Sequence, residues 1–241
     1  MVYTYSHYIS LGNVRKKIAD LVSFTTPATV LDVGTGDGLF AIAFSKKENV
    51  KNVLGIELAP EFLALAEKQV QNHGVKNVSF QKTDFFSSEL KPGFDCISFF
   101  LAVCEFKKPE KVFKRAFELL TPGGFLVLGE EFPELAENKA QKIGYEINRA
   151  LGYKHFPLKK IKQELEKTGF EILVEKVFKT NYPLMNENDL MPFLKDETND
   201  WKTVGVIHDP QELFKKFQSK VRENGFEINP KIVGIIAIKK I

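Results

Sequence analysis

The chain has 241 residues, of which 44% are hydrophobic and 27% are charged, which is typical of one globular domain with a substantial core. The net charge of +3 is small, and lysines alternate with glutamates instead of forming basic blocks, so a nucleic-acid-binding surface is not indicated. Cys96 and Cys104 alone cannot form a disulfide framework or a cysteine metal site. Without a signal peptide or an apolar run of membrane-spanning length, we expect a cytoplasmic protein without a membrane span.

The first predicted elements are an aromatic arm and a helix. Residues 1–11 carry Tyr3, Tyr5 and Tyr8 without apolar periodicity, and a surface arm that covers a hydrophobic edge is one interpretation of them. Residues 13–24 place apolar side chains on one face of an amphipathic helix. We therefore expect residues 1–27 to form an arm and a helix.

A glycine-rich turn follows the first predicted strand, residues 28–33, whose apolar β-branched residues indicate a buried parallel strand. Gly34, Gly36 and Gly38 occupy alternate positions, and a helical pattern begins at Leu39. Such a turn lets a ligand lie against bare backbone beside the unpaired N–H groups of a helix start. The third glycine of a dinucleotide fingerprint would fall at Leu39, and no Gly-Lys-Ser/Thr phosphate loop is present.

The run Val-Leu-Asp-Val-Gly-Thr-Gly-Asp-Gly at residues 30–38 resembles the first motif of class I S-adenosylmethionine-dependent methyltransferases. The resemblance implies S-adenosylmethionine as cofactor and S-adenosylhomocysteine as product. It also implies that Asp32 contacts the cofactor's amino group, often through water. The backbone that holds the methionine part would be that of Gly34, Thr35, Gly36 and Gly38. In that family a tyrosine-bearing arm often closes over the ligands, so a lid is the second interpretation of residues 1–11.

An acidic residue ends the second predicted strand, residues 51–57. Glu57 lies 23 residues after Gly34, close to the separation expected for an acid that binds ribose, and one carboxylate can accept from both ribose hydroxyls. The resemblance gives Glu57 this role and places Leu58 beside the cofactor. An exposed acid near the start of a helix at Pro60 is the alternative.

A helix is predicted over 60–72 and a short strand over 78–81, followed by Lys-Thr-Asp-Phe-Phe. The resemblance implies that Asp84 accepts from the adenine amino group and that the backbone N–H of Phe85 meets the ring. We expect the rings of Phe85 and Phe86 to pack in the core.

The fourth predicted strand, residues 93–100, leads into Leu101–Phe106, where the transferred methyl group meets the acceptor in the family. Phe100 and Leu101 are the cofactor residues implied here. The segment lacks the Asn/Asp-Pro-Pro-aromatic motif of enzymes that methylate DNA bases or glutamine amides. Cys104 follows valine, not the proline of RNA-cytosine enzymes, so we expect a buried inert thiol. No acid ends the strand and no cluster completes a metal site, so we expect no metal.

The segment is otherwise apolar with one acid, Glu105, and resembles small-molecule methyltransferases of the quinone- and sterol-modifying kind. Glu105 either orients the acceptor or acts as general base, or it is a solvated acid before a helix that begins at Pro109. The Leu-x-Pro-Gly-Gly-x-Leu run at 120–126 matches the family's turn before the fifth strand, and we expect its glycines to take positive φ.

The resemblance weakens beyond residue 131. We expect helices over 134–151, 158–168 and 210–224, and strands over 170–179 and 231–240. Residues 181–209 are less regular and form either a substrate-facing insertion or a surface loop. His155 is a candidate general base or a solvated loop histidine. The other polar candidates are Glu130, Glu131, Tyr145, Arg149 and Tyr153.

We therefore predict one α/β domain over 1–241, a Rossmann-like, doubly wound, seven-stranded sheet that is mostly parallel with an antiparallel last strand. Residues 28–131 would bind the cofactor, and 132–157 and 181–209 would be substrate-side insertions. The predicted function is S-adenosylmethionine-dependent methyl transfer to a small-molecule acceptor. An RNA or protein methyltransferase and a cofactor-binding protein without turnover remain the alternatives, and the oligomeric state stays open.

Overall fold

A computed structural model of the chain describes residue 11 and residues 13–180, 183–203 and 207–240. Its strands form one sheet in the order β3-β2-β1-β4-β5-β7-β6. Neighbours from β3 to β5 are parallel, whereas β7 runs antiparallel to both β5 and β6. This confirms the predicted sheet. The strands are β1 (Ala28–Val33), β2 (Val50–Glu57), β3 (Val78–Lys82), β4 (Phe94–Phe100), β5 (Leu120–Glu130), β6 (Phe170–Lys179) and β7 (Lys231–Lys239).

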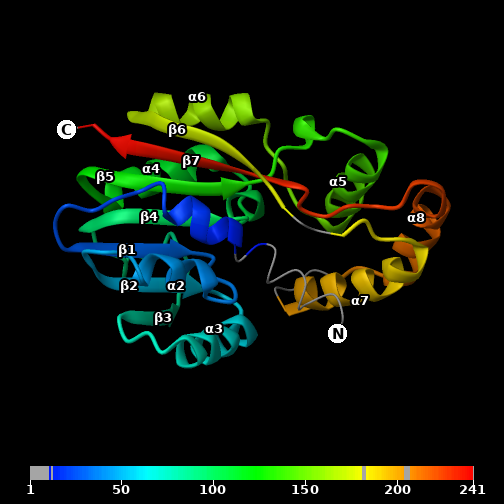
Figure 1. Cartoon of the computed structure of the whole chain (residues 1–241), viewed down its shortest axis with the longest axis horizontal. Coiled ribbons are helices and arrows are strands. Elements are labelled where there is room, and N and C mark those ends of the chain that lie inside the picture. Colours follow the sequence, from blue (N-terminus) through cyan, green and yellow to red (C-terminus); the bar gives the residue numbers. More distant parts are fainter. Residues whose placement is uncertain (1–10, 12, 181–182, 204–206, 241) are drawn as a thin grey trace.

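Helices cover both faces of the sheet because each strand alternates its apolar side chains between two cores. On one face α4 (Pro109–Leu119) and α6 (Leu158–Thr168) pack against the sheet. On the other face lie α2 (Leu39–Ser45) and the helical residues 13–19, and α3 (Pro60–His73) follows beside β3 (Figure 1). The first predicted helix is shorter than expected, since residues 20–21 already form a turn. The tyrosine arm lies outside the described residues.

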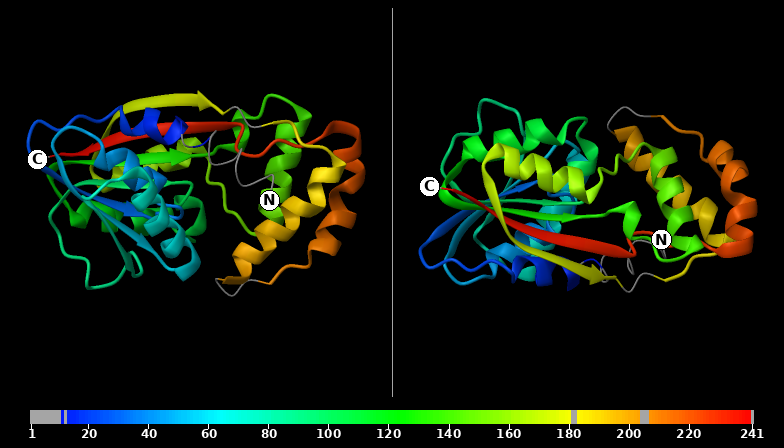
Figure 2. Two further views of the ribbon diagram at one scale, coloured as in Figure 1. Left: turned by 60° about the horizontal axis from the view of Figure 1, so that its bottom comes forward. Right: turned by 90° about the horizontal axis from the view of Figure 1, so that it is seen from above.

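Three further helices form a separate group beyond one end of the sheet, which we call the helical cap (Figures 1 and 2). They are α5 (Lys139–Leu151), α7 (Glu187–Thr203) and α8 (Pro210–Asn224). Their apolar faces make a third core that includes Ile147, Phe193 and Phe217. The cap therefore has its own packing, distinct from the two cores of the sheet.

Two predictions about this region were wrong. The helix expected over 134–151 begins only at Lys139, because a short 3-10 turn, Pro133–Leu135, precedes it and the side chain of Asn138 caps it by accepting from the Gln141 N–H. Residues 181–209 were expected to be irregular, yet α7 occupies most of them. Pro192 and the many Asn and Asp residues hid a helix that is stabilised by its buried face.

The run 120–124 pairs as part of β5, with a register irregularity opposite residues 94–96. Gly123 has a φ of 75°, but Gly124 does not take positive φ as predicted. Gly124 is small for another reason, because a Cβ there would lie 2.9 Å from the Thr121 carbonyl oxygen. In the described part of the chain, none of the helices combines the length and the apolar character that a membrane crossing requires.

Candidate functional site

An open cleft lies at the carboxyl ends of β1, β2 and β4. From β1 the chain continues to β2 and β3 on one side of the sheet and then to β4 and β5 on the other, so this is the topological switch point. Its empty volume is about 660 Å³ including the open solvent at its mouth. We call it the glycine-loop cleft. Its lining residues are Val33, Gly34, Ile56, Glu57, Leu58, Thr83, Asp84, Phe85, Ala102, Glu105 and Phe106.

The glycine loop forms the floor of this cleft. Gly34, Gly36 and Gly38 have φ values of 63°, 51° and 76°, a conformation that other residues rarely adopt. A Cβ on Gly34 would lie 2.9 Å from the Ala102 Cβ, whereas a Cβ on Gly36 would meet nothing closer than the Gly34 carbonyl oxygen at 4.0 Å. The backbone at Gly36 is therefore open to a ligand, and α2 begins directly after Gly38.

Glu57 lies at the carboxyl end of β2 and holds this loop. Its carboxylate accepts from the N–H of Gly36 at 3.1 Å, of Leu58 at 2.8 Å and of Ala59 at 3.2 Å. A carboxylate offers about four acceptor positions, so three backbone donors leave room for one further donor without rearrangement. Leu58 next to it is 51% exposed at the cleft.

The segment after β3 forms the opposite wall. Asp84 is exposed and accepts from the Phe86 N–H at 2.7 Å. Phe85 is buried against Phe99 and Phe106, as predicted. Phe86 is 45% exposed, so the prediction that its ring packs in the core was wrong. The Asp84 carboxylate is thus accessible to a polar ligand edge, and the Phe86 ring beside it is also accessible.

Six predicted cofactor residues are not among those that line the cleft: Asp32, Thr35, Gly36, Gly38, Phe100 and Leu101. Asp32 is 1% exposed and accepts from the hydroxyls of Thr35 and Ser98 at 2.7 and 2.6 Å, so it supports the loop from beneath. Burial raises the pKa of Asp32 to about 6, although both hydroxyls lower it. Thr35 is buried with it, and the ring of Phe100 packs on the other face of the sheet against Phe40.

Arg15 was not predicted to take part in the site. It pairs with Asp37 inside the glycine loop at 3.0 Å, with the two side chains 12% and 3% exposed. Its guanidinium also lies 4.8 Å from the centre of the Phe100 ring. No local signal links residues so far apart in the sequence, but the contact attaches the N-terminal helix to the loop.

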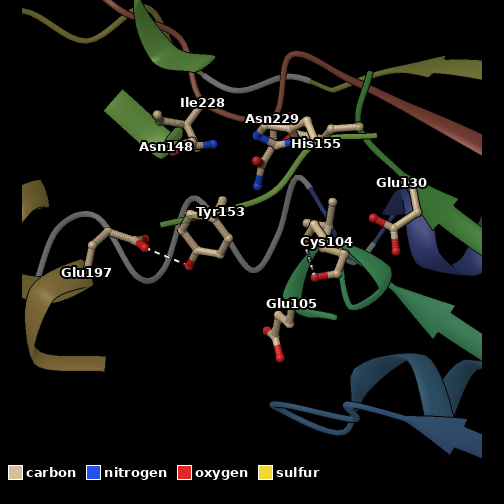
Figure 3. Close-up of a pocket in the computed structure, with 11 residues that line it drawn as sticks. Cys104, Glu105, Glu130, Asn148, Tyr153, His155, Glu197, Ile228 and Asn229 are labelled. Atoms are coloured by element: carbon tan, nitrogen blue, oxygen red, sulfur yellow. Dashed lines mark hydrogen bonds between the residues drawn. The ribbon is translucent and has the colours of Figure 1, made fainter. Parts of the chain in front are cut away.

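A second hollow lies where the carboxyl ends of β4 and β5 meet the helical cap, and we call it the acidic pocket (Figure 3). Its empty volume is about 580 Å³. Four of its side chains are carboxylates, which come from the segment after β4, the end of β5 and α7. The lining residues are Leu101, Cys104, Glu105, Glu130, Glu131, Asn148, Tyr153, His155, Glu197, Ile228 and Asn229.

Glu105 lines both the glycine-loop cleft and the acidic pocket, so it lies at their junction. Solvent reaches its side chain through the cleft, yet protein surrounds it closely enough that desolvation raises its pKa to about 7, with a smaller contribution from the charge of Glu57. Glu105 is nevertheless exposed, so the alternative of a solvated acid before α4 stays open. A carboxyl with this pKa can both accept and return a proton near neutral pH.

Leu101 begins the segment that separates the two hollows, and it is a backbone outlier. Its φ is 54°, which is rare for a bulky residue, and its N–H donates to the Gly129 carbonyl at 2.8 Å. The thiol of Cys104 donates to the Leu101 carbonyl at 3.1 Å. Burial raises the pKa of Cys104 well above its ordinary value, which agrees with an inert thiol.

Two adjacent carboxyls at the end of β5 belong to the acidic pocket. Glu130 is 5% exposed and accepts from the N–H groups of Ala102 and Val103 at 3.0 and 2.8 Å, and burial nevertheless raises its pKa to about 8. Burial also raises the pKa of Glu131 well above its ordinary value. The amide of Asn229 faces Glu131, and with its nitrogen on that side it donates at 3.0 and 3.1 Å.

His155 is not a solvated loop histidine. It lines the acidic pocket, its ring meets that of Tyr145 edge-on at 5.4 Å, and its Nε2 is buried without a partner among the described residues. Burial lowers its pKa to about 4, and the charge of Arg149 lowers it further. The imidazole is therefore neutral at pH 7 and only a weak base there.

The cap contributes residues that the sequence did not reveal as site residues. Glu197 on α7 accepts from the Tyr153 hydroxyl at 2.9 Å, and Asn148 on α5 is 5% exposed and lines the pocket. In the sequence these two residues stand out only as polar, and the sequence does not show where their helices pack. Among the described residues, no group of three or more His, Cys, Asp and Glu side chains is arranged to hold a metal ion.

A family model described as a methyltransferase domain matches residues 6–175. The demethylmenaquinone methyltransferase of Thermus thermophilus is 30% identical over 120 residues, covering 49% of this chain and 54% of that protein. The carboxy-S-adenosyl-L-methionine synthase of Nautilia profundicola is 25% identical over 145 residues, covering 57% and 60%. The chain thus spans only somewhat more than half the length of these relatives.

Among solved structures, a Bacillus halodurans protein described as a candidate methyltransferase is similar with a TM-score of 0.69. The match covers 95% of this chain and 100% of that one at 20% sequence identity. At this identity the similarity concerns the fold alone.

Proposed function

Because the chain belongs to the methyltransferase domain family, whose members use S-adenosylmethionine, we propose that it transfers the cofactor's methyl group to a small-molecule acceptor. The observation that carries this proposal is the junction at Glu105, where the glycine-loop cleft opens toward a second hollow. One hollow would hold the methyl donor and the other the acceptor, as a two-substrate reaction requires.

The residues of the glycine-loop cleft fit the cofactor. The open backbone at Gly36, with Gly34, Thr35 and Gly38 around it, would take the methionine part, and Asp32 would support this loop from beneath. Glu57 and Leu58 would take the ribose, while Asp84 and the Phe85 backbone would take the adenine. Leu101 would lie next to the reacting centre, and Phe100 would act only through its backbone.

When bound, S-adenosylmethionine supplies a methyl group that an acceptor lone pair captures in line while the C–S bond breaks onto sulfur, leaving S-adenosylhomocysteine. The chain's part is to place the acceptor and to exclude water. Residues 132–157 and 181–209 supply cap side chains to the acidic pocket, and we propose that they are the acceptor side of this single domain. A cytoplasmic location stays a prediction.

The test is calorimetric titration with S-adenosylmethionine and, separately, with NAD. We expect micromolar-range binding of S-adenosylmethionine alone. Glu57→Gln keeps one acceptor oxygen and should lower the affinity for S-adenosylmethionine roughly tenfold. Glu57→Ala should lower this affinity roughly a hundredfold. Asp84→Ala should weaken it less, because Asp84 is exposed. Glu67→Gln on the exposed face of α3 is the matched control, and we expect no change.

No heat with S-adenosylmethionine on folded protein would disprove the methyltransferase proposal. Binding without transfer of a labelled methyl group to any acceptor would favour a cofactor-binding protein without turnover. A salt-sensitive gel shift with RNA, or labelled protein product, would favour a macromolecular acceptor.

A further inference from the structure

The charge of the acidic pocket is one-sided. Glu105, Glu130, Glu131 and Glu197 all line it, and no Lys or Arg is among its described lining residues (Figure 3). Figure 3 shows Glu197 and Glu130 on opposite sides of the pocket, so the carboxylates surround the space and do not form one patch. Arg149, whose charge acts on His155, is exposed and does not line the pocket.

One polar group in the wall is buried without a partner within the described part of the chain, the Nε2 atom of His155. The side chain of Asn148 also lines the pocket, although the residue is only 5% exposed. Buried polar groups are rarely left unsatisfied in folded proteins, so His155 indicates a ligand that has a polar atom of its own.

Three of the carboxyls, those of Glu105, Glu130 and Glu131, share the pocket lining with no Lys or Arg among the described residues. Desolvation dominates their raised pKa and neighbouring carboxylates add to it. Lys154 lines a smaller adjoining hollow with Glu130 and Glu131, but it is exposed and does not line the acidic pocket. An anionic acceptor would find no Lys or Arg among the described lining residues. A purely apolar acceptor would leave the Nε2 atom of His155 unsatisfied, whereas a positive charge would favour the ionised form of every carboxyl.

We propose that the acidic pocket takes a cationic small molecule and that an amine nitrogen of it is the methyl acceptor. This inference rests on the proposed function of the same site. An ammonium bound here must lose one proton before its lone pair can attack, and Glu105 at the junction is placed to accept that proton. Methylation then returns the nitrogen to a cation, which the remaining carboxylates stabilise.

The test uses three pairs of molecules that have similar shapes but differ in charge. The pairs are choline with 3,3-dimethyl-1-butanol, 2-phenylethylamine with 2-phenylethanol, and spermidine with 1,8-octanediol. Calorimetry measures each with the full chain, alone and saturated with S-adenosylhomocysteine. We expect the charged member of at least one pair to bind roughly tenfold tighter or more. Binding should also release protons, seen as a heat that depends on the buffer, because the cation lowers the pKa of the carboxyls.

Glu197→Gln and Glu105→Gln should each reduce this preference several-fold, while Glu105→Asp retains it. Glu197 does not line the glycine-loop cleft, so its variant should keep the affinity for S-adenosylhomocysteine and thereby report that the protein is folded. Glu67→Gln is the matched control outside the pocket.

Equal binding of charged and neutral members in all three pairs would overturn the inference, as would methyl transfer to the quinol menadiol but to no amine. Absence of S-adenosylhomocysteine binding would instead count against the proposed function. The cation preference measured on the chain alone would still decide whether the acidic pocket takes a cation, while the amine as methyl acceptor would fall with the proposed function.

Discussion

The two hollows that meet at Glu105 are bounded by different kinds of atoms. The floor of the glycine-loop cleft is backbone, held by Glu57 through the Gly36 N–H and supported by the buried Asp32 through the Thr35 hydroxyl. The walls of the acidic pocket include side chains from the 3-10 turn Val103–Glu105 and from β5, α5 and α7. A backbone-lined cleft keeps its shape when side chains change, whereas a side-chain-lined pocket changes with every substitution. We therefore expect specificity for the acceptor to reside in the acidic pocket and the cap.

The largest effect is expected from Glu130 in the acidic pocket, whose ionisation should make the free energy of unfolding depend on pH. Glu130 has its pKa raised from 4.5 to about 8 in the folded chain. The unfolded chain thus loses this proton first as pH rises. The contribution of Glu130 to the free energy of unfolding is therefore complete below pH 4.5 and is lost progressively between pH 4.5 and 8. At about 1.4 kcal/mol per pKa unit, the loss is of the order of 5 kcal/mol.

Glu130→Gln keeps an acceptor oxygen for the Ala102 and Val103 N–H groups but does not titrate. The free energy of unfolding, measured in urea, should therefore change less with pH over this range in the variant than in the parent chain. In Glu67→Gln it should change as in the parent. The same pH dependence in Glu130→Gln and the parent would contradict the raised pKa of Glu130.

Gly144→Ala would test whether the cap can be damaged separately. A Cβ on Gly144 of α5 would overlap the backbone of Glu227, which cannot move aside as a flexible side chain could. We expect a loss of about 3 kcal/mol in the free energy of unfolding, measured in urea, and faster hydrogen exchange in α5, α7 and α8. Affinity for S-adenosylmethionine should change by less than about threefold.

Gly74→Ala is the control for this variant, because a Cβ there would meet nothing and only the φ of 63° makes it unfavourable, by about 1 kcal/mol. Equal loss of cofactor binding and cap protection in Gly144→Ala would show that the two regions are not separable.

Arg15→Gln would instead damage the cleft side. The change leaves Asp37 buried without its partner, so we expect a loss of about 2 kcal/mol in unfolding free energy. S-adenosylmethionine should bind several-fold more weakly, because Asp37 lies within the glycine loop. Lys16→Gln is the matched control, since its ion pair with Asp20 is exposed and should contribute less than about 0.5 kcal/mol. Equal effects of the two variants would exclude a role for the Arg15 contact.

The smallest effect is expected from Cys104→Ala. The thiol is buried, its pKa is raised, and its only described hydrogen bond goes to the Leu101 carbonyl. Stability should fall by less than about 1 kcal/mol. Methyl transfer should persist, because the thiol is not the nucleophile, although Cys104 lines the acidic pocket and its loss changes the shape of the pocket. Iodoacetamide should modify the native thiol only slowly. Rapid alkylation with loss of transfer would restore the nucleophilic role that the sequence argued against.

The sequence by itself determined the sheet and most of its elements. The bounds of α6, β6 and α8 agree with the prediction to the residue, because each begins and ends at a local signal such as Gly169 at the end of α6. The glycine loop and Glu57 were also found from local spacing. These features are short-range, and a contiguous run of residues is enough to specify them.

Only the tertiary structure decided how the acidic pocket is assembled. Glu130, Asn148 and Glu197 come from three elements that are distant in the chain, and α7 was hidden by Pro192 and polar residues. The burial of Asp32, the core position of the Phe100 ring and the Arg15–Asp37 pair likewise depend on which strands and helices become neighbours. Burial and counter-charges are properties of the packed state, so the pKa of Glu105 and the charge preference of its pocket follow from packing and not from local sequence.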